Sequence, residues 1–117
     1  MQVNTSVTGQ GVAAANLTKY RAVKLDTAGK IAYAAAGDRA VGIIMEDFLA
    51  GETVTYYRLI GSWLHEVSGS VAIGDYVKIG ADGVLVVEAS NTTPTAFTIG
   101  QVRVARATGL PCEVEAC

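Results

Sequence analysis

The sequence predicts an all-β protein, a small β-barrel or β-tulip-like domain built from two similar hairpin-containing units with an extended N-terminal arm. Three observations support this fold class: a motif that occurs twice, a composition suited to strands, and frequent turn signals. Val and Ile together number 22 against 7 Leu, and branching at Cβ suits a pleated sheet better than a helix. The 13 glycines are consistent with many tight turns. A chain of 117 residues is expected to form one domain.

The motif that occurs twice indicates an internal duplication. The segment that starts Val23-Lys24-Leu25 resembles the segment that starts Val77-Lys78-Ile79, 54 residues further along the chain. A second stretch, Val41-Gly42-Ile43, matches Ile99-Gly100-Gln101 with a separation of 58 residues. The second copy therefore carries four additional residues, most simply within residues 90–95.

Residues 1–16 differ from the rest of the chain. Val3, Val7 and Val12 are separated by Asn, Thr, Ser, Gly and Gln with no sustained period, which is typical of an arm that is disordered alone or ordered by a partner. The predicted organisation is an extended arm over residues 1–16 and a single β-domain over residues 17–117. The two repeat units are expected at about residues 17–60 and 71–117.

Apolar runs between turn residues predict the strands of each unit. In the first copy Asp26-Thr27-Ala28-Gly29 is the predicted turn of a hairpin, with Gly29 in the left-handed conformation. Gly80-Ala81-Asp82-Gly83 has the same role in the second copy. The expected strands are Tyr20–Leu25, Lys30–Ala34, Val41–Glu46, Thr53–Ile60, Ser62–Val67, Asp75–Ile79, Val84–Glu88, Phe97–Ala105 and Cys112–Ala116.

Charge and hydropathy exclude two classes of partner. The net charge is −2 and the chain has no basic run interleaved with aromatic residues, so we expect no nucleic-acid partner. The longest apolar run, residues 31–36, is far short of the ~20 residues needed to span a bilayer, so we expect no membrane partner. The N-terminus lacks the basic and apolar regions of a secretory signal, which predicts synthesis in the cytoplasm.

Two patterns resemble catalytic motifs, but in each case a structural role fits the sequence better. Gly9-Gln10-Gly11-Val12-Ala13-Ala14 fits a dinucleotide fingerprint, but that motif works only between a buried strand and a helix. His65 is the only histidine, and one histidine forms neither a catalytic triad nor, with only two cysteines spaced as Cys112 and Cys117 are, a zinc site. We therefore expect no enzyme, no cofactor and no metal.

Several short stretches resemble the head-decoration, or capsid cement, proteins of tailed bacteriophages. The similarity to the lambda-type decoration protein is clearest across about residues 24–67, and the second copy is similar to the broader phage and prophage cement family. The stretches that carry the resemblance are Leu25-Asp26-Thr27, Lys30-Ile31-Ala32-Tyr33, Ala40-Val41-Gly42-Ile43, Thr53-Val54-Thr55-Tyr56-Tyr57, Gly61, Val67, Ala72-Ile73-Gly74-Asp75-Tyr76-Val77 and Ile99-Gly100-Gln101-Val102.

The resemblance implies a trimeric protein on the outer surface of the virion head. It would bind the expanded shell, stabilise contacts between copies of the phage major capsid protein, and be made in the host cytoplasm. The N-terminal segment would order on the capsid by strand addition, which requires β-compatible residues rather than a strict motif. The residues expected to contact the capsid are Gln2, Val3, Asn4, Thr5, Ser6 and Val7, and those expected at the trimer interface are Trp63, His65 and Tyr57.

An alternative function belongs to a different class. A carbohydrate- or ligand-binding β-domain on a virion surface would use exposed aromatic rings as stacking faces. Trp63, Tyr56, Tyr57 and Tyr76 are the candidates for such a role. The competing interpretation is that these rings fill the core and the trimer interface.

Overall fold

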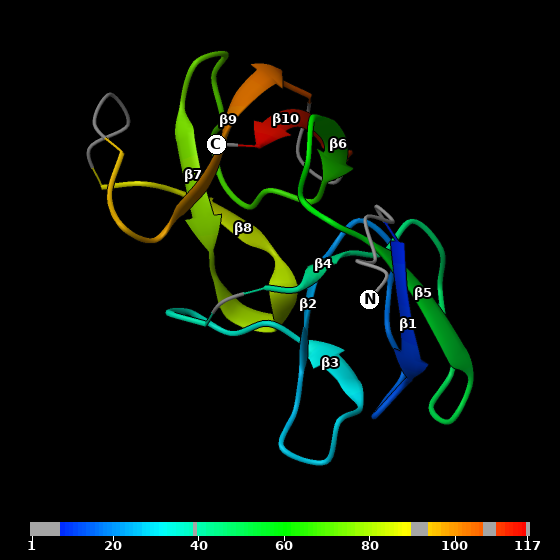
Figure 1. The fold of residues 1–117 in the computed structure, drawn as a ribbon. Coiled ribbons are helices and arrows are strands. Elements are labelled where there is room, and N and C mark those ends of the chain that lie inside the picture. The colour runs from blue at the N-terminus through cyan, green and yellow to red at the C-terminus, as the bar shows by residue number, and fades with distance from the viewer. Residues whose placement is uncertain (1–7, 39, 90–93, 107–109, 117) are drawn as a thin grey trace, which may run out of the picture.

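The computed structural model describes residues 8–38, 40–89, 94–106 and 110–116. In these residues no helix is long and apolar enough to cross a membrane. Figure 1 shows a lower half, coloured blue to green, and an upper half, coloured green to red. The elements are β1 (Thr8–Val12), β2 (Ala22–Leu25), β3 (Ile31–Tyr33), β4 (Gly42–Ile43), β5 (Thr53–Tyr57), β6 (Ser62–His65), β7 (Tyr76–Ile79), the 3-10 turn η1 (Ala81–Gly83), β8 (Leu85–Val87), β9 (Thr98–Val104) and β10 (Cys112–Ala116).

The all-β fold class is confirmed, and so is the presence of a strand in each of the nine predicted ranges. The observed strands are shorter than the apolar runs that predicted them, most of all β4, which contains only Gly42 and Ile43. An apolar run marks burial, whereas a strand also requires a paired backbone, so the two differ at strand ends.

The strands form two five-stranded antiparallel sheets with the same internal order. The first sheet has the order β1-β5-β4-β2-β3 and the second has the order β6-β10-β9-β7-β8. Each strand of one sheet therefore has a counterpart at the same place in the other, and the pairs β2/β7 and β3/β8 are separated by the 54 residues of the sequence repeat. The predicted duplication is confirmed in the topology.

Each sheet curls until its edge strands meet, which makes each unit barrel-like. A single parallel bridge joins Ala13 to Ile31 in the first unit and Val67 to Leu85 in the second. Backbone conformation repeats as well: Tyr20, with φ of 67°, stands where the second unit has Gly74, with φ of 92°. The two units are thus copies of one backbone rather than two halves of one sheet.

Equivalent residues fill the two cores. All six buried residues of the first core have a counterpart in the second, five of them buried and one, Val71, partly buried. Burial of these side chains is the main stabilising contribution within each unit. The pairs are Ala13 and Val67, Leu17 and Val71, Val23 and Val77, Ile31 and Leu85, Ile44 and Val102, and Val54 and Cys112.

The structure corrects the predicted boundary between arm and domain. β1, which lies inside the predicted arm of residues 1–16, pairs along its full length with β5, and Ala13 is buried. The first unit therefore begins by Thr8 rather than at residue 17, and β1 is the counterpart of β6. A Cβ on Gly9 would lie 2.3 Å from the Tyr56 ring, and one on Gly11 would lie 2.7 Å from Ile31. The packing of β1 requires glycine at these two positions, and the same glycines make its sequence resemble that of a flexible arm.

The fit between Gly9 and Tyr56 gives a direct test of this correction. We expect Gly9→Ala to destabilise the chain by about 1–3 kcal/mol, because the new methyl group overpacks against the ring. In a Tyr56→Val background the same change should lower the free energy of unfolding much less. At the equivalent place in the second unit, β6 and β10 pair Trp63 with Val114, so a side chain is accommodated opposite a valine there. Urea unfolding of the four proteins of this double-mutant cycle measures both effects. If β1 were a free arm, Gly9→Ala would be neutral in both backgrounds.

The two units meet along a seam where the second unit packs on small residues of the first. Ala22 and Ala34 are fully buried and belong to the core of the second unit. The Gly83 N–H donates to the Ala34 carbonyl oxygen at 2.7 Å, and the Glu66 N–H donates to the carbonyl oxygen of Tyr20 at 2.7 Å. The seam therefore joins the units through backbone hydrogen bonds and buried alanines.

Candidate functional site

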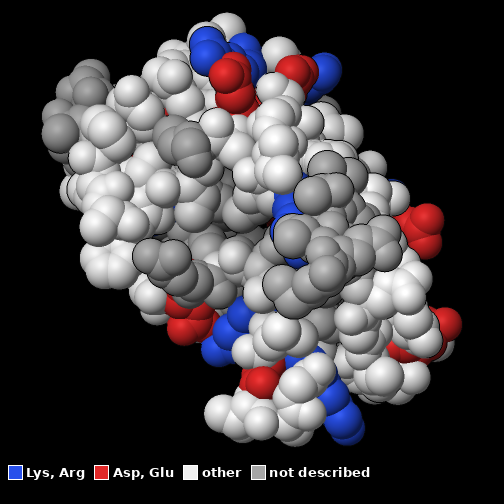
Figure 2. Space-filling view, in the orientation of Figure 1, with Lys and Arg blue, Asp and Glu red and all other residues white. Residues whose placement is uncertain are grey.

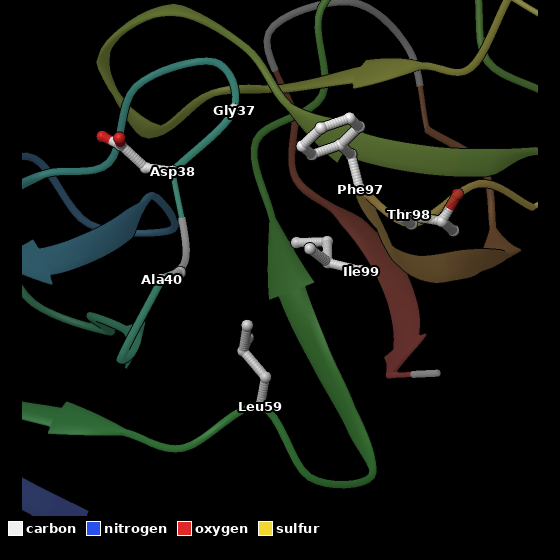
Figure 3. A pocket seen from close by; sticks show the side chains of 8 residues that line it. Gly37, Asp38, Ala40, Leu59, Phe97, Thr98 and Ile99 are labelled. Carbon is white, nitrogen blue, oxygen red and sulfur yellow. The ribbon is translucent and has the colours of Figure 1, made fainter.

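An open hollow lies at the seam, with walls from both units. Its volume is about 390 Å³, and Leu59, Ala40 and Asp38 of the first unit face Phe97 and Ile99 of the second. Figure 3 shows the side chains of Leu59 and Ile99 extending into the space between the units, with Phe97 at its rim and the Asp38 carboxylate turned away. Phe97 is 60% exposed, an unusual state for a large aromatic ring. The hollow is a solvent-open groove with both apolar and polar lining.

A buried carboxylate organises the segment that carries Phe97. Glu88 is only 5% exposed, and its Oε1 accepts hydrogen bonds from the hydroxyls of Thr95 and Thr98, each at 3.2 Å. The Thr98 hydroxyl also accepts from the Thr95 N–H at 2.8 Å. Burying a carboxylate is costly unless hydrogen bonds compensate it, so this network holds one geometry. The segment follows residues 90–93, which are outside the described part of the chain.

The charge beside the hollow is already neutralised. The Asp38 carboxylate accepts from Lys24 Nζ at 2.7 Å and from the Ala35 N–H at 2.8 Å. The hydrogen bond from Lys24 and then that from the Ala35 backbone lower the pKa of Asp38 below its ordinary value. Among the described residues that line the groove, the one charged side chain is therefore already paired.

The three residues predicted at a trimer interface lie close together, and one of them is inside the protein. The rings of Tyr57 and Trp63 pack at 5.2 Å between centroids, where the first unit leads into the second. Both are partly buried, and Tyr56 covers Gly9, so the rings serve packing within the chain. His65 is only 2% exposed and does not reach the surface of the single chain.

His65 and Trp63 are also notable for unpaired nitrogens. Among the described residues, His65 Nδ1 and Trp63 Nε1 are buried without a hydrogen-bond partner. Burial lowers the pKa of His65 to about 4, because the interior disfavours its charged form. His65 is therefore neutral at pH 7.

The expected capsid contacts Gln2, Val3, Asn4, Thr5, Ser6 and Val7 lie outside the described residues. On the described surface, the face in Figure 2 is largely uncharged, with charged side chains gathered mainly toward its edges. No group of three or more His, Cys, Asp or Glu side chains within residues 8–38, 40–89, 94–106 and 110–116 could hold a metal ion.

The fold is similar to that of a solved phage protein. The head fiber gp8.5 N base of bacteriophage phi29 superposes with a TM-score of 0.78, covering 95% of this chain and 93% of that one at 16% sequence identity. The chain has the fold of a bacteriophage head fiber base. No protein-family model matches the sequence, and no curated protein matches it significantly. At 16% sequence identity this similarity establishes the fold but not the function.

Sequence reasoning did not find the residues that shape the hollow. Leu59 lies inside a predicted strand, and Phe97 and Glu88 lie at the ends of two others. One signal pointed to this place, namely the change of repeat separation from 54 to 58 residues, which locates the added segment just before Phe97. Which apolar side chains stay exposed depends on how two units pack, and a linear pattern does not contain that information.

Proposed function

We propose that this chain is a structural protein associated with a bacteriophage head. The observation that carries the proposal is the fold, which matches a phage head fiber base over nearly the whole of both chains. The resemblance of residues 24–67 and of the second copy to decoration proteins supports the same conclusion independently of the coordinates. A largely uncharged face is also consistent with a protein that works by packing against other proteins.

We further propose that it acts as a decoration protein on the outer surface of the expanded head. In this role it forms homotrimers that stabilise contacts between major capsid proteins. Residues Gln2–Val7 supply the capsid contact, as an uncharged segment directly before the edge strand β1. Each segment binds weakly because ordering it costs entropy, and three segments on one trimer recover affinity through avidity.

Deletion of residues 2–7 tests the capsid contact. Because β1 starts at Thr8, the deletion removes none of the described structure. We expect the shortened chain to keep its circular dichroism spectrum and unfolding midpoint but to lose about a hundredfold in affinity for expanded heads, as avidity amplifies the loss. Occupancy of purified heads that lack the protein, measured by sedimentation, gives the affinity.

Two controls accompany this deletion. Replacement of residues 2–7 by a Gly/Ser linker should behave like the deletion, whereas a chain with Gln2 and Asn4 exchanged should bind normally, because strand addition does not require a strict motif. Full head occupancy by the deleted chain would contradict the proposed contact. A tight dimer of the free protein would contradict the proposed trimer.

A further inference from the structure

The seam within the chain shows how one unit docks on another. The end of the second unit's barrel is closed by the side of the first. Three residues at that end make the contact. The Glu66 carboxylate pairs with Arg21 Nε at 2.9 Å, and the Gly83 N–H donates to the Ala34 carbonyl oxygen at 2.7 Å. Ile79 is 4% exposed and belongs to the core that contains Ala22 and Ala34. A Cβ on Gly83 would lie 2.3 Å from the Ala22 oxygen, so the approach is close.

The first unit carries the same end, and no described residue of this chain covers it. Its counterparts of Glu66, Ile79 and Gly83 are Val12, Leu25 and Gly29, each 54 residues earlier. Val12 is 43% exposed and Leu25 is 49% exposed. Apart from the two chain neighbours of Gly29, no described residue has an atom within 4 Å of a Cβ built on it. Figure 1 shows this hairpin between β2 and β3 projecting from the bottom of the molecule. An end that is buried in one unit is therefore open in the other.

The open end carries two charged side chains, Asp26 and the exposed Lys30. Asp26 is committed to the turn, since its Oδ1 accepts from the Ala28 and Lys30 N–H groups, each at 2.9 Å. Val12 stands in place of Glu66, so a partner needs no counterpart of Arg21. The surface that fits this end consequently has small side chains and a backbone carbonyl, as Ala22 and Ala34 provide for the second unit.

A second copy of this chain does not offer such a surface. Its first-unit alanines are already covered by its own second unit. In the second unit the counterparts of Ala22 and Ala34 are Tyr76 and Glu88, and the Glu88 carboxylate lies under the hydroxyls of Thr95 and Thr98. Larger side chains and the Thr95–Thr98 segment fill the place where another unit would dock. A second copy therefore does not fit the open end in the way that the second unit fits the first.

We propose that the end of the first unit, formed by Val12, Leu25, Thr27, Ala28 and Gly29, is a docking surface for a sheet edge of another protein. That edge carries small side chains and a free backbone carbonyl, and Gly29 approaches it as Gly83 approaches Ala22. This inference rests on the proposed function, in which the partner belongs to the phage head. The docking surface is separate from the capsid contact proposed for residues 2–7.

Substitutions at the open end test the proposal on expanded heads. Leu25→Asp places a charge in the contact, and Thr27→Arg blocks it from an exposed turn position without touching the core. We expect each to weaken head binding at least about tenfold, as loss of a central apolar contact does. Ile73→Asp is the matched control, since Ile73 is 72% exposed in the second unit and outside the proposed surface. Unfolding midpoints verify that all three variants fold.

Each outcome separates the possibilities. Loss of binding by Leu25→Asp and Thr27→Arg with normal binding by Ile73→Asp supports the docking surface. Normal binding by both open-end variants overturns it while leaving the proposed function intact. A change in the oligomeric state of free Leu25→Asp overturns the choice of partner in favour of a second copy. If the wild-type chain and Ile73→Asp also fail to bind heads, both proposals fall together.

Discussion

Replacement of Gly83 by Ala is expected to destabilise the chain by about 2–4 kcal/mol, the largest loss we predict for a single methyl group. Gly83 has φ of 73°, a conformation that L-residues rarely adopt. Its added Cβ would lie 2.3 Å from the Ala22 oxygen and 3.1 Å from the Ala22 nitrogen, and backbone atoms cannot move aside as a side-chain tip can. The seam would have to open, weakening the hydrogen bond from Gly83 to Ala34.

The chain contains a matched control for this substitution. Gly29 is the equivalent residue of the first unit, with φ of 78°, and apart from its two chain neighbours no described residue has an atom within 4 Å of a built Cβ. Gly29→Ala should therefore cost only the conformational strain, about 1 kcal/mol. Urea unfolding of both variants measures the difference, which isolates the close approach at the seam. Equal losses for the two alanine variants would mean that the units do not pack as described.

Acidification between pH 6.5 and about 4 is expected to lower the free energy of unfolding by about 3 kcal/mol through His65 alone. Burial lowers the pKa of His65 from 6.5 to about 4 in the folded chain. Below pH 6.5 the unfolded chain binds a proton that the folded chain does not yet bind, so protons favour unfolding. Above pH 6.5 His65 is neutral in both states and contributes no pH dependence.

A neutral replacement isolates this contribution. His65→Gln keeps a polar side chain that does not titrate, so its stability should fall less than that of the wild type between pH 7 and pH 4.5. Comparison with the wild type is needed because carboxylates such as Asp38, whose pKa is lowered, add acid sensitivity to both proteins. Urea unfolding at the two pH values gives the difference, and NMR titration of the His65 ring gives its pKa. A ring pKa near 6.5 would contradict the burial described here.

The fold class and the duplication could be predicted because their signals are local. The hairpin turn around Gly29 and its counterpart at Gly83 come from residues that accept a positive φ, and each position has one in the structure. β1 could not be predicted, because Gly9 and Gly11 have no side chains where Tyr56 and Ile31 pack. That requirement appears only when β5 is placed beside β1, through a pairing about 45 residues apart in sequence.

The exposure of individual side chains was less predictable than the fold. A strand pattern identifies the face on which His65 and Trp63 lie, but not that His65 is buried within the single chain. Likewise, Leu25 and Ile79 occupy equivalent positions in the repeat, and only the packing of one unit on the other exposes the first and buries the second. The exposure of a side chain depends on tertiary packing, so equivalent positions in the two units can differ in exposure.

The contiguity of each unit in sequence has a consequence for synthesis. Every strand of the first sheet precedes every strand of the second, so during translation the first unit can close its β1–β5 pairing before β7 leaves the ribosome. Ala22 and Ala34 then face solvent until the segment around Gly83 emerges. During that interval the nascent chain has an uncovered apolar side, and the time that the segment around Gly83 needs to leave the ribosome sets how long it lasts.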